Sequence, residues 1–578
     1  MENIEYIRHS LAHLLGASIL ELYPGSKITL GPAIDSGFYY DIDVNGKITD
    51  ADLLNIESKM RELVKSWKTF DKKVLTKEEA LEFFKGNEYK EELINEIVSK
   101  GEEITVYTSG NFSDLCRGGH VEDTKNINLD AFKLEKVAGA YWRGNEKNKM
   151  LTRVYGLAFL TKEELDAYVS QQEEAKKRDH RKLGAELGLF VISDLVGAGL
   201  PLIKPKGMII RSEIESYLWD LHKEKGYYKV WTPHITKINL YETSGHAAKF
   251  GNELFRVKGG DEEFFMKPMN CPHHMQIFSD NQFSYRDMPV RYFEPATVYR
   301  YEKAGQLSGL TRVRSITQDD GHLFCRISQI GKEVSTIVSI IKQFYTTMGM
   351  FDGYWVRLSV RGDDMSKYLG NDDVWDQAEE ALEKAAKENQ LNYKTGRDEA
   401  AFYGPKLDFM FKDAIGREWQ LATIQCDFNL PEKFKLSFKN EKGEDERPVV
   451  IHRAISGSLE RFMGVMIEHF AGTFPTWLSP VQVIVLPVSE HQKEYASDIF
   501  NELKTQNIRV EIDDSNESLG KRIRNAKMQK VPYLIVVGDK EKEGKVITVE
   551  ARMEKIEGIT TEKFLEKLNK EIKERALN

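Results

Sequence analysis

The chain has 578 residues, enough for about three or four domains, and its 41% hydrophobic and 30% charged residues predict a globular protein. No run approaches the ~18 apolar residues that a membrane span needs, no secretory signal opens the chain, and the four scattered cysteines exclude a disulfide framework, so we expect a cytoplasmic protein without a membrane partner. The net charge of −9 argues weakly against a nucleic-acid partner, although local basic patches are more informative than the total.

Four side chains in the first 160 residues indicate either zinc binding or hydrolysis. Residues 7–20 are predicted to form an amphipathic helix, which places His9 and His13 four positions apart on one face. Cys116 and His120 follow much later, in the string DLCRGGH. One thiol and three imidazoles can ligate zinc, and they can also activate water without a metal. For the histidine pair alone, an ordinary helix surface is the simpler interpretation.

Several strings of this region resemble the editing domain of the threonyl-tRNA synthetases, a family of class II aminoacyl-tRNA synthetases. The similar strings are HSLAHLL, GPAIDSGFYYD, DLCRGGH and AGAYWRGNEKNKMLTRVYG. The resemblance implies that residues 1–160 form an α+β editing domain, which hydrolyses seryl-tRNA made in error and works without a bound metal. The site residues that it implies are His9, His13, Lys90, Asp114, Cys116 and His120.

Two departures from the family pattern accompany this resemblance. The chain begins almost at HSLAH, where the family usually has a small ubiquitin-like domain first, and RGGH replaces the commoner RGPH. We expect the first departure to affect tRNA handling and the second to be mild. Editing is needed because serine and threonine differ by one methyl group, which a pocket distinguishes by only about 1–3 kcal/mol.

A linker and a long helix come next. Residues 161–190 are rich in Glu, Lys and Ala and are predicted to form a linker helix and then an entry helix that ends at glycines. Residues 206–225 are predicted to form an amphipathic helix that runs into a strand ending at Pro233. This unit suits an ordinary helix–strand pair. It also resembles motif 1 of the class II synthetases, which forms their dimer interface, and so implies a homodimer.

The stretch of residues 291–326 is predicted to be a long antiparallel hairpin. Residues 291–300 alternate apolar and polar side chains, residues 302–310 hold two glycines and indicate a turn, and residues 311–320 are extended again. Its dense charges suit surface salt bridges, and they equally suit bidentate binding of phosphate or carboxylate by arginine. The strings VYRYE and GLTRVRSITQDDGHLFC resemble motif 2 of class II synthetases, and specifically that of the threonyl-tRNA synthetases.

The same resemblance implies a catalytic domain over residues 191–478, built on an antiparallel β-sheet. In it Arg300 would bind the α-phosphate and the carboxylate, Glu302 the adenine amino group, and Arg312 a further part of ATP. The side chains that would line the amino-acid pocket are Gln318, Asp320, Tyr403, Gln420, Thr423 and Gln425. The remaining candidates are Lys406 for phosphate or carboxylate, Ser458 and Arg461 of motif 3 for ATP, and His246 for transfer to the tRNA ribose.

Three dispersed residues are candidates for a metal site. One thiolate and two imidazoles suit tetrahedral zinc with one position open, but spacing alone does not select them, and His273 and His274 compete. The resemblance selects Cys271, His322 and His452, which in the family hold one zinc ion that binds the amine and hydroxyl of threonine. Valine lacks the hydroxyl and would be rejected, whereas serine would pass. Mg²⁺ would accompany ATP.

Residues 479–578 are predicted to form an α/β domain with a mostly parallel sheet, because strands and helices alternate along the segment. One helix there places Lys521, Arg524 and Lys527 on a shared face. Such a face suits phosphate binding, and it suits a solvated surface about equally well.

This C-terminal segment resembles the anticodon-binding domain shared by several class II synthetases. The anticodon contacts that the resemblance implies are Asn516, Arg524 and Glu541. Val549 and Glu550 stand where the family commonly has an arginine, so we expect anticodon recognition to be altered or weakened.

Three functions compete at this point. The resemblance implies a threonine–tRNA ligase with an editing domain, whose substrates are ATP, L-threonine and tRNA(Thr). A noncatalytic regulator that binds tRNA or mRNA should lack at least one of five residues that are all present, namely Arg300, Arg461, Cys271, His322 and His452. A ligase for another amino acid is disfavoured by the Cys–His–His set. The sequence therefore predicts a multidomain α+β enzyme.

Overall fold

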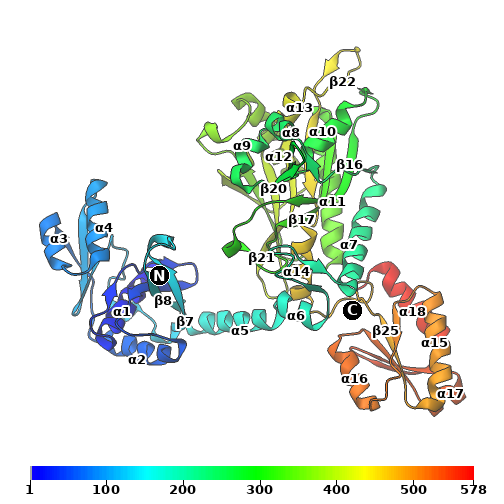
Figure 1. Ribbon diagram of the computed structural model, residues 1–578, viewed down its shortest axis with the longest axis horizontal. Helices are drawn as coiled ribbons and strands as arrows, with labels where there is room; N and C mark the ends of the chain where they lie inside the picture. Colours follow the sequence, from blue (N-terminus) through cyan, green and yellow to red (C-terminus); the bar gives the residue numbers. More distant parts are fainter. Residues whose placement is uncertain (1–2, 578) are drawn as a thin grey trace. The chain divides into compact units, whose positions relative to one another are not determined.

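The structure is a computed structural model that describes residues 3–577, apart from the side chain of Asn252. The chain divides into two compact units, Met1–Glu173 and Glu174–Asn578, and the helix α5 runs across their boundary (Figure 1). Sheets and helices occur in both units, so the α+β class is confirmed. Among the described residues, none of the helices has the length and apolar character that crossing a membrane requires.

The N-terminal unit is organised around α1 (Ile4–Leu22). Asn3 begins this helix, because its side-chain oxygen accepts a hydrogen bond from the backbone N–H of Glu5 at 3.0 Å. Leu11 and Leu15 on its apolar face are buried in the core of the unit. The helix predicted for residues 7–20 is confirmed, and the structure extends it at both ends.

Two antiparallel sheets complete this unit. The first has the order β1-β3-β8-β7, with β2 paired to β3, and packs with α1 and α2 (Leu53–Leu63). Its strands are β1 (Lys27–Ile28), β2 (Ala33–Ile34), β3 (Gly37–Asp43), β7 (Phe132–Tyr141) and β8 (Met150–Ala158). The second sheet and its two helices are β4 (Asp71–Leu75), β5 (Ile104–Ser109), β6 (Phe112–Leu115), α3 (Lys77–Phe83) and α4 (Glu88–Ser99).

The linker forms two helices, α5 (Lys162–Arg178) and α6 (His180–Glu186). The break falls at Asp179, whose side chain accepts a hydrogen bond from the backbone N–H of Arg181 at 2.8 Å and so begins α6. The expectation of a linker helix followed by an entry helix is confirmed.

A large sheet of eight strands forms the centre of the second unit, in the order β11-β16-β17-β24-β21-β20-β18-β19. Neighbours are antiparallel except at the two edges, where β11 and β19 run parallel to β16 and β18. In sheet order the strands are β11 (Tyr228–Lys229), β16 (Val290–Tyr299), β17 (Ser315–Cys325), β24 (Val449–Ala454), β21 (Glu418–Asp427), β20 (Lys406–Lys412), β18 (Trp355–Val360) and β19 (Tyr393–Arg397). The antiparallel sheet expected for the catalytic domain is confirmed.

Helices bury one face of this sheet and leave the other to form a site. Ile214 on α7 and Phe344 on α11 are fully buried in the shared core, with Leu323 and Ile451 of the sheet. Each such side chain contributes roughly 1.5–3 kcal/mol by leaving water. The helices are α7 (Pro205–Lys223), α11 (Ile330–Thr347), α12 (Asp372–Glu388) and α14 (Leu459–His469).

Two predicted strand boundaries were wrong. The strand expected to end at Pro233 is only Tyr228–Lys229, and the returning strand of the hairpin begins at Ser315 instead of residue 311. Residues 311–314 lie in the turn because their partners are local or lie outside the sheet. The backbone N–H of Arg312 bonds to Ser308 O at 3.1 Å, and that of Arg314 bonds to the carbonyl oxygen of Gly199 at 2.8 Å.

Shorter helices and strands complete this part of the second unit. The helix α10 (Cys271–Ser279) has a proline in its first turn, where the missing N–H costs nothing. The other short elements are α8 (Ile238–Ser244), α9 (His246–Phe250), α13 (Asn429–Lys433), β9 (Phe190–Val191), β10 (Leu202–Ile203), β12 (Ile235–Thr236), β13 (Arg256–Gly259), β14 (Glu262–Met266), β15 (Phe283–Ser284), β22 (Phe438–Lys439) and β23 (Asp445–Glu446).

The C-terminal domain is a five-stranded sheet in the order β26-β25-β27-β28-β29. The first three of these strands run parallel and the last two are antiparallel, so the mostly parallel sheet that we predicted is mixed. The elements are β25 (Val483–Pro487), α15 (Lys493–Thr505), β26 (Val510–Ile512), α16 (Leu519–Met528), β27 (Tyr533–Val537), α17 (Asp539–Gly544), β28 (Ile547–Ala551), β29 (Lys555–Ile559) and α18 (Thr561–Glu574).

Candidate active site and hydrolytic cleft

A cavity of about 400 Å³ opens over the central sheet. Its size suits a nucleotide or a small metabolite. Strands β17, β20, β21 and β24, the turn after β16 and the start of α14 supply its walls. The candidate residues that line it are Arg300, Glu302, Arg312, Gln318, Asp320, His322, Tyr403, Lys406, Gln420, Thr423, Gln425, His452, Ser458 and Arg461. The structure therefore brings together residues that span more than 160 positions of the sequence, as the resemblance implied.

Arg300, Arg312 and Arg461 are three of the four arginines that line this cavity. Arg300 follows β16 directly and lies over the ring of Phe250, with 5.3 Å from its Cζ to the ring centroid. Arg312 forms an ion pair with Glu302 at 2.8 Å, and Arg461 donates from Nε to the carbonyl oxygen of Thr311 at 3.0 Å. Guanidinium groups placed this way can bind the phosphates and the carboxylate of a substrate bidentately.

Motif 3 is positioned by a helix cap. Ser458 begins α14, because its hydroxyl oxygen accepts a hydrogen bond from the backbone N–H of Arg461 at 3.2 Å. The hydroxyl also donates to Glu460 at 3.1 Å, whose other oxygen pairs with Arg211 of α7 at 3.1 Å. The cap therefore fixes both the start of the helix and the direction of Arg461.

Asp408 organises one wall of the cavity, and the sequence analysis missed it. This carboxylate is fully buried and accepts from Gln420 Nε2 at 2.7 Å, Thr423 Oγ1 at 3.1 Å and Ser359 Oγ at 2.9 Å. It also forms an ion pair with Lys406 at 2.8 Å. The signal was its place two positions after Lys406 on β20, which puts both side chains on the same face of the strand.

Cys271, His322 and His452 meet although they are far apart in the sequence. Cys271 is the first residue of α10, while His322 on β17 pairs directly with His452 on β24. One possible ligand atom from each residue lies within 4.8 Å of those from the other two, and all three side chains are buried. One thiol and two imidazoles at this spacing fit a tetrahedral zinc ion, and the cavity beside the two histidines leaves room for a fourth ligand.

The two competing histidines do not belong to the group whose ligand atoms converge. Among the described residues neither ring nitrogen of His273 has a hydrogen-bond partner, and His274 bonds to Glu294 at 3.0 Å and to Nδ1 of His322 at 2.7 Å. His452 donates from Nε2 to Asp427 at 2.9 Å, which leaves its Nδ1 for a metal. Burial raises the pKa of the Cys271 thiol well above its ordinary value and lowers the pKa of His322 well below its own.

His246 lies behind the cavity wall. Its side chain is fully buried, its Nδ1 is 2.7 Å from Ser244 Oγ, and its Nε2 is 3.6 Å from Cys271 Sγ. Burial lowers the pKa of this imidazole to about 3, which keeps it neutral. The structure therefore places His246 beside a candidate metal ligand rather than among the residues that line the cavity.

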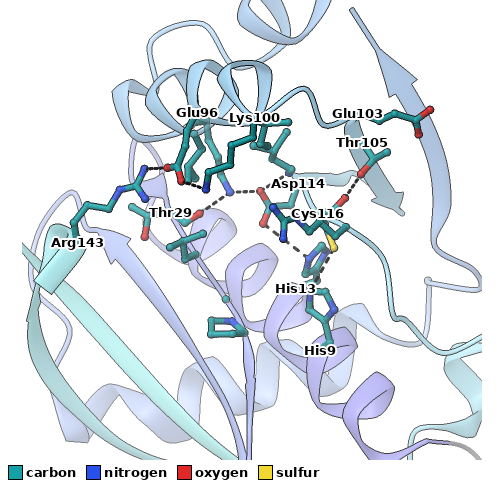
Figure 2. Close-up of a pocket in the computed structure, with 18 residues that line it drawn as sticks. His9, His13, Thr29, Glu96, Lys100, Glu103, Thr105, Asp114, Cys116 and Arg143 are labelled. Atoms are coloured by element: carbon teal, nitrogen blue, oxygen red, sulfur yellow. Dashed lines mark hydrogen bonds and ion pairs between the residues drawn. The ribbon is translucent and has the colours of Figure 1, made fainter. Parts of the chain in front are cut away.

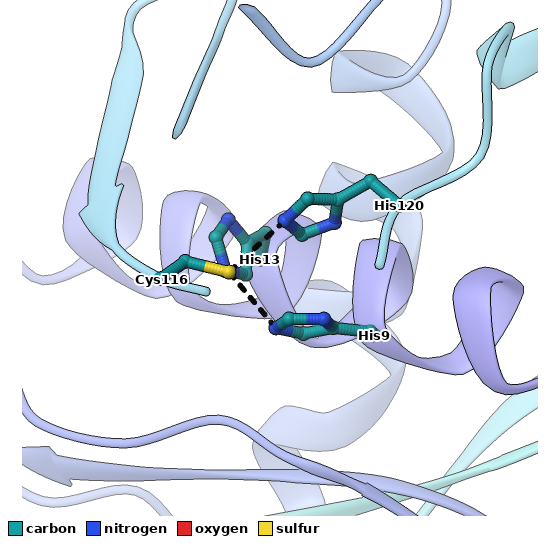
Figure 3. Close-up of side chains that lie close together, drawn as sticks. All are labelled: His9, His13, Cys116 and His120. Carbon is teal, nitrogen blue, oxygen red and sulfur yellow. Dashed lines mark hydrogen bonds between the residues drawn. The ribbon is translucent and has the colours of Figure 1, made fainter. Parts of the chain in front are cut away.

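The N-terminal unit has a cavity of its own, of about 360 Å³ (Figure 2). His9, His13, Lys90, Asp114 and Cys116 line it, as the sequence analysis expected of an editing site. Figure 3 shows the sulfur of Cys116 between two imidazoles. The first imidazole belongs to His9, whose Nε2 is 3.4 Å from Sγ. The second imidazole belongs to His120, whose Nε2 is 3.3 Å from Sγ.

The buried carboxylate of Asp114 contacts several of the side chains that form this cleft. Asp114 forms an ion pair with the Lys90 ammonium group and accepts a hydrogen bond from the hydroxyl of Tyr40. Lys90 also donates to the carbonyl oxygen of Thr29 at 2.6 Å. Nε2 of His13 lies 4.0 Å from the same carboxylate. Tyr40 was missed by the sequence analysis, although it belongs to the string GPAIDSGFYYD that carries the resemblance.

Burial keeps the reactive groups of this cleft uncharged. It lowers the pKa of His120 to about 2, and it lowers the pKa of His9 and, more strongly, that of His13. It also raises the pKa of the Cys116 thiol to about 12. The cleft therefore offers three neutral imidazoles, which can accept a proton from water, and a protonated thiol.

Comparisons with known proteins agree with both sites. Residues 104–155 match the threonyl and alanyl tRNA synthetase second additional domain, and residues 255–470 match the tRNA synthetase class II core domain (G, H, P, S and T). The threonine–tRNA ligase of Rubrobacter xylanophilus is 48% identical over 96% of this chain and 86% of that protein. That of Thermus thermophilus is 48% identical over 99% of this chain and 89% of that protein.

The chain belongs to the threonine–tRNA ligase family. Among solved structures, the RNA binding domain of threonyl-tRNA synthetase from Cryptosporidium parvum is similar, with a TM-score of 0.65 and 35% identity. The similarity covers 68% of this chain and 98% of that one. The expected resemblance to threonyl-tRNA synthetases is thus confirmed.

Residues 482–571 match the anticodon binding domain of this family's class. The structure places the implied contacts Asn516 in the loop before α16, Arg524 on α16 and Glu541 on α17. Glu541 has a structural partner already, because its carboxylate accepts from the backbone N–H of Gly538 at 2.9 Å and from Thr548 Oγ1 at 2.8 Å.

The basic face of α16 is partly neutralised. Lys521 pairs with Glu517 at 2.8 Å, and Lys527 pairs with Glu550, the residue that departs from the family pattern. The side chain of Val549, the other departing residue, is fully buried in the sheet. Two of the three cations that we grouped as a phosphate footprint therefore have acidic partners within the domain.

Proposed function

We propose that the chain attaches L-threonine to tRNA(Thr) in the central cavity and hydrolyses seryl-tRNA(Thr) in the N-terminal cleft. It does so as a member of the threonine–tRNA ligase family. The observation that supports this assignment of sites best is that three arginines and Lys406 share one cavity with His322 and His452. We place the enzyme in the cytoplasm, where its substrates are ATP, L-threonine and tRNA(Thr).

In the first step, a carboxylate oxygen of threonine attacks the α-phosphorus of ATP. The bond from that phosphorus to the bridging oxygen breaks, pyrophosphate leaves, and threonyl-adenylate forms. Arg300 and Arg461 stabilise the negative charge that develops on the phosphoryl oxygens, with Lys406 held toward the same region by Asp408. Mg²⁺ enters with ATP as part of that substrate, and Glu302 and Arg312 bind the nucleotide.

We assign amino-acid selection to the candidate zinc ligands, two of which line the cavity. When bound by Cys271, His322 and His452, one zinc ion supplies a Lewis acid for the amine and hydroxyl of the substrate. Asp320 is oriented by the amide of Asn270, which donates to its carboxylate at 2.9 Å, so it can accept from the same amine or hydroxyl. In the second step the 3′-terminal ribose hydroxyl of the tRNA attacks the carbonyl carbon of the adenylate, and AMP leaves.

The assignment is tested by charging a tRNA(Thr) transcript with labelled threonine in the presence of ATP. We expect the purified chain to threonylate this transcript and to leave a tRNA with an unrelated anticodon and acceptor stem uncharged. Incorporation that is absent from both transcripts, with folded protein, would contradict a ligase.

In the N-terminal cleft, water attacks the ester carbonyl carbon of seryl-tRNA and a neutral imidazole accepts its proton, so serine and free tRNA are released. We propose that this happens without a metal. A zinc ion bound by His9, His13, Cys116 and His120 would have all four tetrahedral positions filled by protein and none left for water. Such an ion could not activate water, so we propose a metal-free cleft and expect one zinc ion per chain, in the catalytic domain.

The lowered pKa values of the three cleft histidines predict how the deacylation rate depends on pH. An unperturbed histidine has a pKa of about 6.5, and burial lowers the pKa of all three cleft histidines below their ordinary value. The imidazoles therefore stay neutral as the pH falls through 6.5. We expect the single-turnover rate of seryl-tRNA deacylation to be level from about pH 8 to 6.5 and to fall only at lower pH. An acid limb with its midpoint at 6.5 or above would contradict the neutral cluster.

A homodimer is the third proposal, and exposed apolar side chains support it. In the motif 1 region Tyr228 is 68% exposed and Trp231 72%, and Leu195, which precedes this region, is 100% exposed. Apolar surface of this kind is typical of a subunit interface. We expect wild-type protein at micromolar concentration to sediment as a dimer, and Trp231→Asp to sediment as a monomer. Leu54→Asp, a 74% exposed position on α2, is the control and should leave the dimer intact.

A further inference from the structure

We propose that Glu294, acting through His274, determines which ring nitrogen of His322 carries a proton and thereby leaves Nε2 of His322 free to bind the metal. Glu294 and His274 touch neither substrate nor metal, so both are positioning residues. The inference rests on the proposed zinc site, and it concerns how the chain prepares one ligand of that site.

The three side chains form one buried line of hydrogen bonds. Oε2 of Glu294 is 3.0 Å from Nε2 of His274, and Nδ1 of His274 is 2.7 Å from Nδ1 of His322. Their exposed fractions are 2%, 0% and 1%. Water therefore cannot supply alternative partners, and each bond in the line must have one donor and one acceptor.

The carboxylate fixes the direction of this line. Because an ionised carboxylate only accepts, Nε2 of His274 must carry the proton of the first bond. Nδ1 of a neutral His274 is then an acceptor, so Nδ1 of His322 carries the proton of the second bond. The lone pair of His322 is left on Nε2, the nitrogen that lies on the side of Asp320, 3.9 Å from Oδ1 of that residue.

The groups around Glu294 balance its negative charge. The Lys267 ammonium group lies 3.6 Å from Oε1, and the backbone N–H of Thr232 donates to the same oxygen at 2.7 Å. The hydroxyl of Thr232, which accepts from Lys267 at 2.7 Å, donates to the carboxylate as well. The negative charge of Glu294 is thus matched by Lys267, and the two bonds of the line need only one proton each.

The two histidine ligands are therefore prepared in different ways. His452 donates directly to the carboxylate of Asp427 at 2.9 Å, whereas His322 reaches a carboxylate only through a second imidazole. Removing the outer partner of a metal-binding histidine weakens metal affinity by about 10–100-fold. We expect a similar loss of zinc affinity when Glu294 is replaced, although Glu294 contacts His322 only through His274.

Two substitutions of Glu294 separate the effect of hydrogen-bond direction from the effect of side-chain size. In Glu294→Gln the amide oxygen will face the donors at Oε1, namely Thr232 and Lys267, so the amide NH₂ will face His274. That NH₂ donates to Nε2 of His274, and the whole line reverses. Nε2 of His322 then carries a proton in the metal-free protein, so zinc binds only after this proton has moved, and its affinity falls. Glu294→Asp is shorter but still only accepts, so it preserves the direction.

The test measures zinc affinity by competition with a chromophoric chelator on full-length protein, together with the d–d absorption bands of the Co²⁺-substituted form. We expect Glu294→Gln to bind zinc about 10–100-fold more weakly than wild type and Glu294→Asp to lie closer to wild type, although glutamine is the better match in size. The control is Glu333→Gln, which removes a 1% exposed carboxylate that pairs with Arg291 at 2.7 Å and touches no metal ligand. It should bind zinc as wild type does.

Equal zinc affinity in wild type and Glu294→Gln would overturn the inference, and so would an equal loss in Glu294→Gln and Glu333→Gln, which would indicate general destabilisation. If Glu294→Gln does not fold, the comparison of wild type with Glu294→Asp decides: a loss of about 10-fold or more in the aspartate variant contradicts a role set by direction. Failure of the zinc site itself is distinct, because wild-type protein would then hold no zinc and Cys271→Ser would change nothing.

Discussion

Replacing Cys271 by serine is expected to remove the bound zinc and to lower kcat/KM for threonine activation by about 10⁴-fold, the loss seen when a site built to bind a substrate hydroxyl can no longer do so. Serine is nearly isosteric with cysteine, and the side chain is fully buried, so the fold should survive. A serine hydroxyl, however, does not become an anionic ligand as a thiolate does, and two imidazoles alone hold zinc poorly. Metal content and threonine-dependent pyrophosphate exchange on the same samples measure both effects.

Cys325→Ser is the matched control. Cys325 is also fully buried, lies on β17 three residues after His322, and is not part of the three-residue group. We expect this variant to keep its zinc and its activity. Full threonine activation by Cys271→Ser with no zinc bound would contradict the metal site.

Replacing Cys116 by alanine is expected to slow seryl-tRNA deacylation by about 10²-fold or more, the usual contribution of a positioned acid or base, while threonine activation stays unchanged. The thiol is bonded to Nε2 of both His9 and His120, at 3.4 and 3.3 Å, so its loss frees two imidazoles at once. His13→Ala should have a similar effect from a different element of the cleft, because this imidazole lies against Asp114.

Two readouts separate this outcome from misfolding. Single-turnover deacylation of preformed seryl-tRNA reports on the cleft, and threonine-dependent pyrophosphate exchange reports on the central cavity of the same protein. Cys426→Ala removes a buried thiol elsewhere and should deacylate seryl-tRNA at the wild-type rate. An unchanged deacylation rate in both Cys116→Ala and His13→Ala would contradict the editing assignment.

Much of this architecture could be predicted because it depends on local patterns. The alternation in residues 291–300 gave the first strand of the hairpin, and the register from Val290 with Phe324 to Tyr299 with Ser315 confirms the antiparallel pair. The spacing of His9 and His13 placed both on one helix. The family resemblance then indicated which distant residues belong to one site, and the cavities hold most of them.

The partners behind the site residues could not be predicted, because they are set by packing between distant elements. From the sequence, none of these roles was assigned to Asp408, Glu294 or His274, although Asp408 stands two positions after Lys406 and His274 was a candidate ligand. Their roles depend on which oxygen or nitrogen faces which neighbour. Only the three-dimensional structure shows that Asp408 lies beneath both Lys406 and Gln420.

Charge patterns were the least reliable guide. The face of Lys521, Arg524 and Lys527 suggested phosphate binding, but the ion pair between Lys527 and Glu550 joins α16 to β28, which are 23 positions apart at these residues. A periodicity within one helix cannot reveal an acidic partner on another strand. The same limitation applies to Arg314, whose backbone partner Gly199 lies over a hundred positions earlier.

The most direct test of the account is amino-acid-dependent ATP–pyrophosphate exchange, run in parallel with threonine, serine and valine on the wild-type, zinc-loaded chain. We expect strong exchange with threonine, weaker exchange with serine and none above background with valine. Only threonine and serine have the hydroxyl group that the candidate zinc site selects. Exchange with valine as strong as that with threonine, or none with any of the three, would contradict the account.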